Sequence, residues 1–172
     1  MAADLNSLNA YLSIKDRMKT GDLLQWRSDS LIGAAIRWRT GSEVNHSGLV
    51  LRLQEYEGLE RRRWTSEALG HGVYPVLLSR KLESFKGSAW WHPLKDDSLR
   101  TEAGRRIVEM FGVGYDFHAI LRQIFGRVST DLRRLFCSEY CYYCVGGWGT
   151  APNPGNLISE TGLWEEEGVQ IL

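Results

Sequence analysis

The spacing of apolar residues changes near residue 97: strand-like runs mixed with helical segments come before it, and mainly helical spacing follows it. Before it, helical spacing appears at Leu5, Leu8 and Leu12 and in a segment that Ser28 or Ser30 can cap. Short strand-like runs bounded by turn residues make up the rest of this half. The predicted strands cover residues 21–27, 46–53, 62–68, 73–79 and 89–93, and the predicted second helix ends at Thr40 to Ser42.

Helical spacing dominates the second half of the chain. Ser98 is expected to cap a helix that runs to about Gly112, with Ile107, Val108 and Phe111 on its buried side. The other predicted elements are a helical stretch from about residue 115 to 125, a helix that opens near Cys137 and ends at Gly146, and a short strand over residues 168–172.

The order of these elements predicts one α+β domain over residues 1–172, with a mainly antiparallel sheet packed against helices. The polar turn over residues 54–61 predicts that residues 62–68 return antiparallel to residues 46–53. Pro75 cannot donate a hydrogen bond to a neighbouring strand, so its strand is expected at an edge of the sheet or at a bulge.

Composition excludes several classes of protein. Lys+Arg and Asp+Glu both number 21, so no net charge recruits nucleic acid or an anionic membrane. No apolar run reaches about 18 residues, so no membrane span is expected. The N-terminus carries Asp4 and no apolar segment after a basic start, so we expect no secretory signal and a cytoplasmic location. The three cysteines lie within eight residues and do not make a disulfide framework.

Cys137 is the first candidate for chemistry, because it opens the predicted helix over residues 137–146. Unpaired backbone N–H groups and the positive end of the helix dipole would face its sulfur, which favours the nucleophilic thiolate. The same N–H groups could hold an oxyanion during attack on a carbonyl. A free cysteine is more often an inert core residue, so a partner base is needed to support this role.

His46 and Glu67 are the candidate partners. His46 opens a predicted strand and can act as the base for a thiol, while Glu67 lies on the strand expected to pair with it. A carboxylate there can hold the imidazole tautomer and stabilise its cation, although Glu67 beside Arg61 to Arg63 is equally consistent with a surface residue. His71 is a rival for the third role, but its flanking glycines favour a turn.

Cys141 and Cys144 follow Cys137 at the spacing C-x3-C-x2-C. On one helix the first and last sulfur atoms would be roughly 10 Å apart along the axis, which is too far for one compact cluster. The spacing i, i+4, i+7 is also typical of a buried helix face, so these two residues are expected in the core. His92 and His118 do not cluster with the cysteines in the sequence, and no metal site is expected.

Several short motifs stand in a fixed order between about residues 20 and 160, and together they resemble a known family. They are residues 21–24, 30–32 leading to 40–42, 46–50, 66–68 followed by 72–73, 115–117 and 136–139. In this order they resemble the circularly permuted papain-like hydrolases of the NlpC superfamily, specifically the YiiX-like branch. In that family the histidine precedes the cysteine in sequence, as His46 precedes Cys137 here.

The resemblance implies a permuted papain-like fold in which Cys137 is the nucleophile, His46 the base and Glu67 the orienting residue. Some relatives place a histidine in the third position, which keeps His71 as a rival. Members include peptidases and amidases acting on cell-wall peptides, and acyltransferases acting on lipids. The resemblance therefore implies a peptide or acyl substrate and no metal or organic cofactor.

We expect a cysteine peptidase or amidase that cleaves an amide bond through an acyl-enzyme. One alternative is a lipid acyltransferase or thioesterase that uses the same site. That function would favour a membrane-binding segment, and the sequence shows no clear segment of that kind. A second alternative is a non-catalytic peptide-binding module, which would predict a missing triad member, and the sequence contains candidates for all three.

Overall fold

The computed structural model of the chain describes residues 5–54, 58–69, 72–113 and 136–172. Within these ranges, six strands form one sheet in the order β4-β3-β2-β1-β5-β6, and every pair of neighbours is antiparallel. The strands are β1 (Leu23–Ser28), β2 (His46–Leu51), β3 (Trp64–Leu69), β4 (Gly72–Leu77), β5 (Gly87–His92) and β6 (Val169–Gln170). The predicted α+β class with a mainly antiparallel sheet is confirmed.

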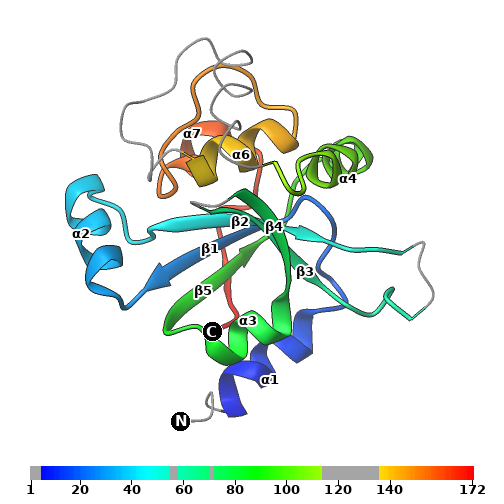
Figure 1. Cartoon of the computed structure of the whole chain (residues 1–172), viewed down its shortest axis with the longest axis horizontal. Helices are drawn as coiled ribbons and strands as arrows, with labels where there is room; N and C mark the ends of the chain where they lie inside the picture. Colours follow the sequence, from blue (N-terminus) through cyan, green and yellow to red (C-terminus); the bar gives the residue numbers. More distant parts are fainter. Residues whose placement is uncertain (1–4, 55–57, 70–71, 114–135) are drawn as a thin grey trace.

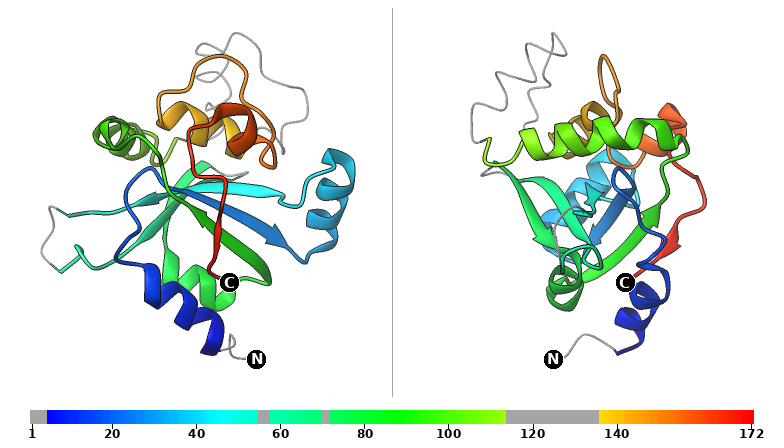
Figure 2. Two further views of the ribbon diagram at one scale, coloured as in Figure 1. Left: turned by 180° about the vertical axis from the view of Figure 1, so that it is seen from behind. Right: turned by 90° about the vertical axis from the view of Figure 1, so that its right-hand side faces the viewer.

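Helices cover both faces of this sheet (Figures 1 and 2). They are α1 (Leu5–Ile14), α2 (Leu31–Thr40), α3 (Leu78–Ser84), α4 (Arg100–Glu109), α6 (Phe136–Cys144) and α7 (Leu157–Thr161), and a 3-10 turn, η1 (Asp97–Leu99), precedes α4. Helices α4, α6 and α7 lie over one face, and α1 and α3 lie over the other (Figure 1). None of the helices in the described ranges is both long enough and apolar enough to cross a bilayer.

Two apolar clusters, one on each face, form the core. Leu23 and Leu49 pack into the cluster under α4, α6 and α7, while Leu24 and Val50 pack into the cluster with α1 and α3. Successive strand residues point to opposite faces, so a strand covered on both sides needs apolar residues in succession. This burial explains the apolar run at the end of β2, which does not alternate with polar residues.

Asp22, at the start of β1, is a buried carboxylate that joins three parts of the fold. It accepts hydrogen bonds from Trp91 Nε1 at 2.8 Å and from the backbone N–H of Leu94 at 3.0 Å. Arg100 of α4 donates to it at 2.7 Å. These bonds satisfy a charge that would be costly to bury alone, and they tie the start of β1 to β5 and to α4.

Two sequence-based expectations about helices need correction. Leu12, on the predicted stripe of α1, is 46% exposed, and Tyr11 and Ile14 are buried instead. Val108 was predicted on the buried side of α4 but is exposed. The buried residues of that helix are Ala103 and Ile107. Apolar spacing alone did not fix which side of each helix meets the sheet.

The structure also corrects two element boundaries. The Asp96 side chain accepts from the N–H of Ser98 and caps η1, so Ser98 does not cap α4, which begins only at Arg100. The predicted strand over residues 73–79 ends at Leu77, where α3 begins without a side-chain cap. The edge position predicted from Pro75 is confirmed, because β4 is the outermost strand of the sheet.

Candidate active site

Cys137 is the second residue of α6, as the sequence predicts, and it is buried. This position places the sulfur close to the positive end of the α6 dipole, which favours a negative charge there. Helix α6 packs on β2 and β3, and Tyr140 Oη lies 2.5 Å from Ser66 Oγ of β3. This contact anchors the cysteine-bearing helix to the strand that also carries Glu67.

His46 and Glu67 meet across β2 and β3, which pair antiparallel. His46 Nε2 lies 2.8 Å from Glu67 Oε2. The carboxylate is buried, and the imidazole is one-fifth exposed. Gly48 makes room for this arrangement, because a Cβ at that position would lie 2.8 Å from Glu67 Cγ. The structure thus brings the predicted imidazole and carboxylate together.

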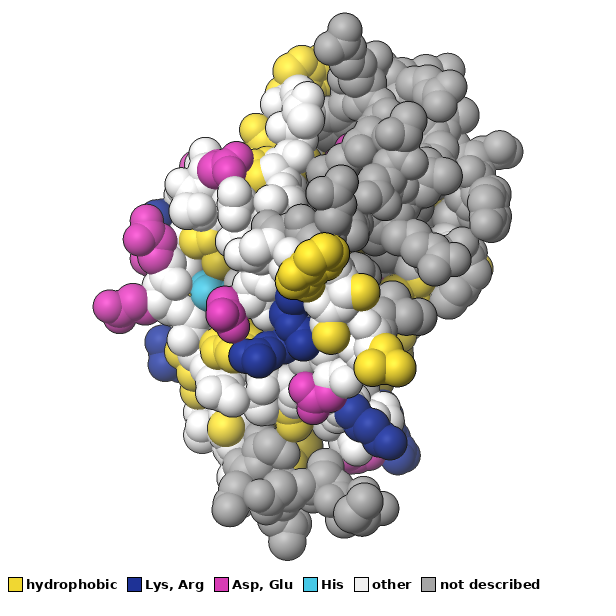
Figure 3. All heavy atoms as spheres, turned by 90° about the vertical axis from the view of Figure 1, so that its left-hand side faces the viewer, with side chains coloured by type: hydrophobic (Ala, Val, Ile, Leu, Met, Phe, Trp, Pro, Cys, Tyr) yellow, Lys and Arg dark blue, Asp and Glu magenta, His cyan; other side chains and the backbone are white. Residues whose placement is uncertain are grey.

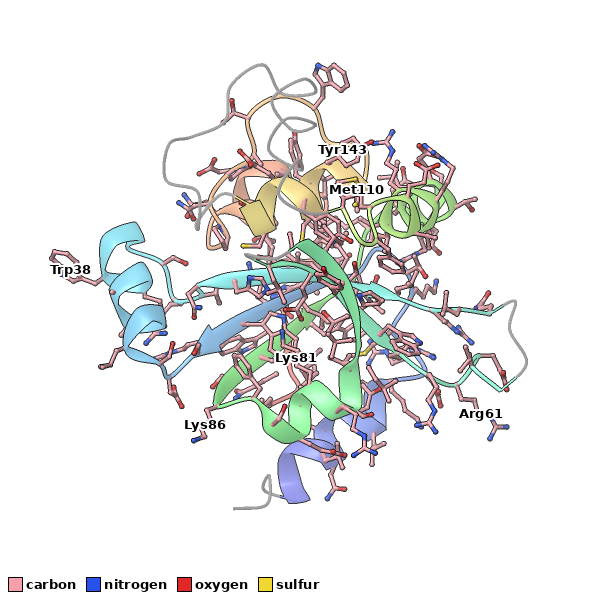
Figure 4. All side chains as sticks on the ribbon, viewed as in Figure 1. Trp38, Arg61, Lys81, Lys86, Met110 and Tyr143 are labelled. Carbon is pink, nitrogen blue, oxygen red and sulfur yellow. The ribbon has the colours of Figure 1, made fainter. Side chains whose placement is uncertain are left out.

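Lys81 of α3 is a site residue that sequence reasoning missed. Its ammonium group donates to both carboxylate oxygens of Glu67 and lies 4.0 Å from the ring centroid of Trp26. Ser66 and Glu67 are successive residues of β3 and point to opposite faces, so Ser66 meets α6 and Glu67 meets α3. Figure 4 shows Lys81 reaching from α3 toward the sheet. No motif marked this residue, since α3 itself was not predicted.

Charge interactions at the site keep His46 and Glu67 ionised at neutral pH. Burial opposes the positive charge of His46, but the negative charge of Cys137, its hydrogen bond and Glu67 outweigh burial and raise the pKa of His46 to about 9. Burial also opposes the charge of Glu67, but His46 and Lys81 lower the pKa of Glu67 to about 2. His46 is therefore linked to both the sulfur and the carboxylate, as in a triad.

The other two cysteines have core environments, as predicted. Cys141 and Cys144 are fully buried on α6 and pack into the cluster under that helix. Burial raises the pKa of both thiols well above the ordinary value. They remain protonated at neutral pH, so a difference in reactivity from Cys137 is expected.

Of the remaining histidines, the structure describes only His92, and it lies apart from His46 and Glu67. His92 is buried on β5, where its Nδ1 lies 2.9 Å from the carbonyl oxygen of Glu165, and burial lowers its pKa. His71, the rival for the third role, lies outside the described residues. His118 and the predicted helical stretch at residues 115–125 also lie outside them.

Comparison with known proteins identifies the fold. No family model matches the chain, and no curated protein is similar to it in sequence. Among solved structures, the chain is similar to YiiX from Escherichia coli O157:H7, with 19% identity and a TM-score of 0.52. The match covers 74% of this chain and 64% of YiiX, so this chain spans less than two thirds of that protein. The YiiX-like fold expected from the motifs is confirmed.

YiiX is described as a metalloprotein, which raises the question of whether this chain has a metal site. Within those residues, no three His, Cys, Asp or Glu side chains form a group that could hold a metal ion. Two candidate donors, His46 and Glu67, are bonded to each other, and Glu67 is also paired with Lys81. The site as described does not fit a metal centre, and the absence of a metal cofactor remains a prediction.

Proposed function

We propose that this chain is a cysteine hydrolase that cleaves an amide bond, using Cys137, His46 and Glu67 as nucleophile, base and orienting residue. The observation that supports it is the position of His46, which interacts with Cys137 while its Nε2 contacts Glu67. With Nε2 occupied by the carboxylate, Nδ1 is the ring nitrogen left to exchange a proton with the reacting groups. Glu67 fixes the tautomer and favours the imidazolium.

In the acylation step, the Cys137 thiolate attacks the carbonyl carbon, and a C–S bond forms as the carbonyl electron pair moves onto oxygen. The N–H groups at the start of α6 are suited to hold this oxyanion. The tetrahedral intermediate then collapses and the C–N bond breaks. The leaving amine takes the proton of the His46 imidazolium, which leaves neutral His46 and a thioester on Cys137.

Water completes the cycle in the same site. Neutral His46 removes a proton from a water molecule, whose oxygen attacks the thioester carbonyl. The C–S bond breaks, the carboxylic acid product leaves, and the thiolate and imidazolium are restored. Above pH of about 9, His46 loses the proton that the leaving amine needs, so turnover is expected to fall there.

A second candidate function is acyl transfer to or from a lipid, with the same nucleophile and a different acceptor. One observation favours it: the apolar helix α2 precedes His46 in the chain and exposes large apolar side chains. Sequence reasoning found no such segment, because apolar spacing in α2 is equally typical of a core helix.

Probes that carry a thiol-reactive group on either a peptide or a fatty-acyl chain test the proposal and choose between these substrates. Wild-type protein is expected to gain one probe mass per chain, at Cys137, and to react faster with the peptidyl probe. Faster reaction with the acyl probe would favour the lipid function. Absence of any adduct with both kinds of probe would contradict the proposed enzyme.

Lys81→Met tests whether Lys81 positions Glu67. The unbranched side chain retains contact with Trp26, but the cation beside Glu67 is lost. The pKa of Glu67 should rise from about 2, so the acidic limb of the pH–rate profile should move to higher pH. Turnover at neutral pH should fall by roughly tenfold, which corresponds to an increase of about 1.4 kcal/mol in the activation free energy.

Lys81→Arg is the matched control, since it keeps the positive charge. It should retain the acidic limb of the wild-type profile. If Lys81→Met had the same profile as wild type, Lys81 would have only a structural role. The measurement is turnover of a peptidyl ester as a function of pH, with the melting temperature of each variant recorded in parallel.

A further inference from the structure

Helix α2 carries an apolar stripe that faces solvent. Leu31, Ala34, Ala35 and Trp38 follow the spacing i, i+3, i+4, i+7, which places them on one side of a helix. All four are exposed, and Leu31 and Trp38 are 91% and 85% exposed. Figure 1 shows α2 projecting at one end of the sheet, and Figure 4 shows Trp38 pointing away from the rest of the protein.

The contacts that hold α2 in place are the caps at its two ends and a bond from Arg37 to β1, and none of them involves the exposed stripe. Ser30 caps its first turn by accepting from the N–H of Gly33, and Gly41 ends it in the left-handed conformation. Arg37 donates to the carbonyl oxygen of Ser28, the last residue of β1. α2 is therefore a fixed element whose exposed side chains have a defined direction.

The basic residues of α2 indicate which kind of surface can cover this stripe. Residues 31–40 contain Arg37 and Arg39 and no acidic residue, although the whole chain has equal numbers of acidic and basic residues. Lys86 lies near its N-terminal end, because its carbonyl oxygen accepts from the N–H of Asp29. Figure 3, which faces this side of the molecule, shows hydrophobic side chains beside Lys and Arg, with some Asp and Glu side chains among them. The acidic residues next to α2 are Asp29 and Glu43, and Glu43 is paired with Arg27. Apolar and basic residues together are complementary to an anionic lipid surface.

The size of the stripe argues against a protein partner. A stable interface buries roughly 800 Å² on each partner. A helix of ten residues is about 15 Å long, and only two of the four side chains in this stripe are large. A bilayer needs no complementary groove, and Trp is among the residues favoured at its interface.

We infer that α2 docks this protein on the surface of anionic phospholipid bilayers, with Leu31 and Trp38 inserted at the boundary between headgroups and acyl chains. The docked helix leads through residues 41–45 to His46, so the membrane would lie near the candidate site. Asn45 Oδ1 accepts from the N–H of Ser28 at 2.7 Å, which fixes this connection to β1. The inference rests on the exposed residues of α2 and holds whether or not Cys137 is catalytic.

Co-sedimentation with two kinds of vesicle tests the inference directly. One kind is phosphatidylcholine alone, and the other is phosphatidylcholine mixed with phosphatidylglycerol. Wild-type protein should sediment with the mixed vesicles and much less with the neutral ones, and salt should weaken binding. The double variant Leu31→Ser/Trp38→Ser should lose binding by about tenfold or more, because it no longer buries two large apolar side chains.

Trp148→Ser is the matched control, because Trp148 is also highly exposed, at 78%, but follows α6 in the chain. It should bind vesicles like wild type, and all variants should keep the wild-type circular dichroism and melting temperature. Equal loss of binding in both variants, or no binding of wild type to mixed vesicles, would overturn the inference. Concentration-dependent dimerisation that is lost only in the double variant, without vesicle binding, would assign the stripe to a second copy instead.

Discussion

Cys137→Ala is expected to abolish covalent turnover, because no other described group can form the proposed thioester at this site. Removing the nucleophile of a triad costs roughly 10⁶-fold in turnover. The variant should fold normally and should show no acyl-enzyme by intact-protein mass spectrometry. The double variant Cys137→Ala/Glu67→Gln should be no less active than Cys137→Ala, because triad residues act as one unit.

Cys141→Ala supplies the control on the same helix. Cys141 is fully buried, and burial raises the pKa of its thiol, so it serves packing. Its replacement should lower the melting temperature and leave the acyl-enzyme intact. Loss of the adduct in Cys141→Ala, with retention in Cys137→Ala, would show that the nucleophile had been assigned to the wrong cysteine.

Glu67→Gln is expected to lower the acylation rate by roughly 10- to 10⁴-fold, by analogy with triads whose carboxylate is neutralised. The amide keeps the shape of the side chain but removes the negative charge that helps to raise the pKa of His46 to about 9. The alkaline limb of the pH–rate profile should therefore move to lower pH, because His46 would lose its proton more easily. A pH series of single-turnover acylation measures both effects.

The same substitution should also cost stability, because Lys81 would be left without its counter-charge. Lys81 is only 16% exposed and donates to both oxygens of Glu67. The double variant Glu67→Gln/Lys81→Met should recover stability without recovering activity. If Glu67→Gln were as active as wild type and His71→Asn were severely impaired, the orienting role would belong to His71.

The pairing of His46 with Glu67 was accessible from the sequence. A polar turn between two apolar runs predicts an antiparallel pair, and this pairing brings the two residues close enough to interact. The start of α6 near Cys137 was equally accessible, because an apolar pair leads into a run with helical spacing. Both the pairing of β2 with β3 and the start of α6 depend on residues close together in the chain, so a single sequence is enough to predict them.

Lys81 and the exposure of α2 were not accessible in this way. α3 begins directly after β4 without a side-chain cap, so no helix-start signal separated it from the strand. The contact of Lys81 with Glu67 depends on the register of β3 and on how α3 packs on the sheet. A single sequence fixes neither. For α2, apolar spacing shows which side chains share a face, but only the tertiary structure shows that nothing in the described residues covers Leu31 and Trp38.

Selective alkylation of Cys137 tests the central claim most directly. In mildly acidic buffer an ordinary free thiol, with a pKa of about 8.5, is protonated and reacts slowly with iodoacetamide. His46, with its pKa of about 9, keeps its positive charge there and favours the Cys137 thiolate. Peptide mapping should show rapid labelling of Cys137 alone, and His46→Asn should slow it. Equal labelling of Cys137, Cys141 and Cys144, or no effect of His46→Asn, would contradict the account.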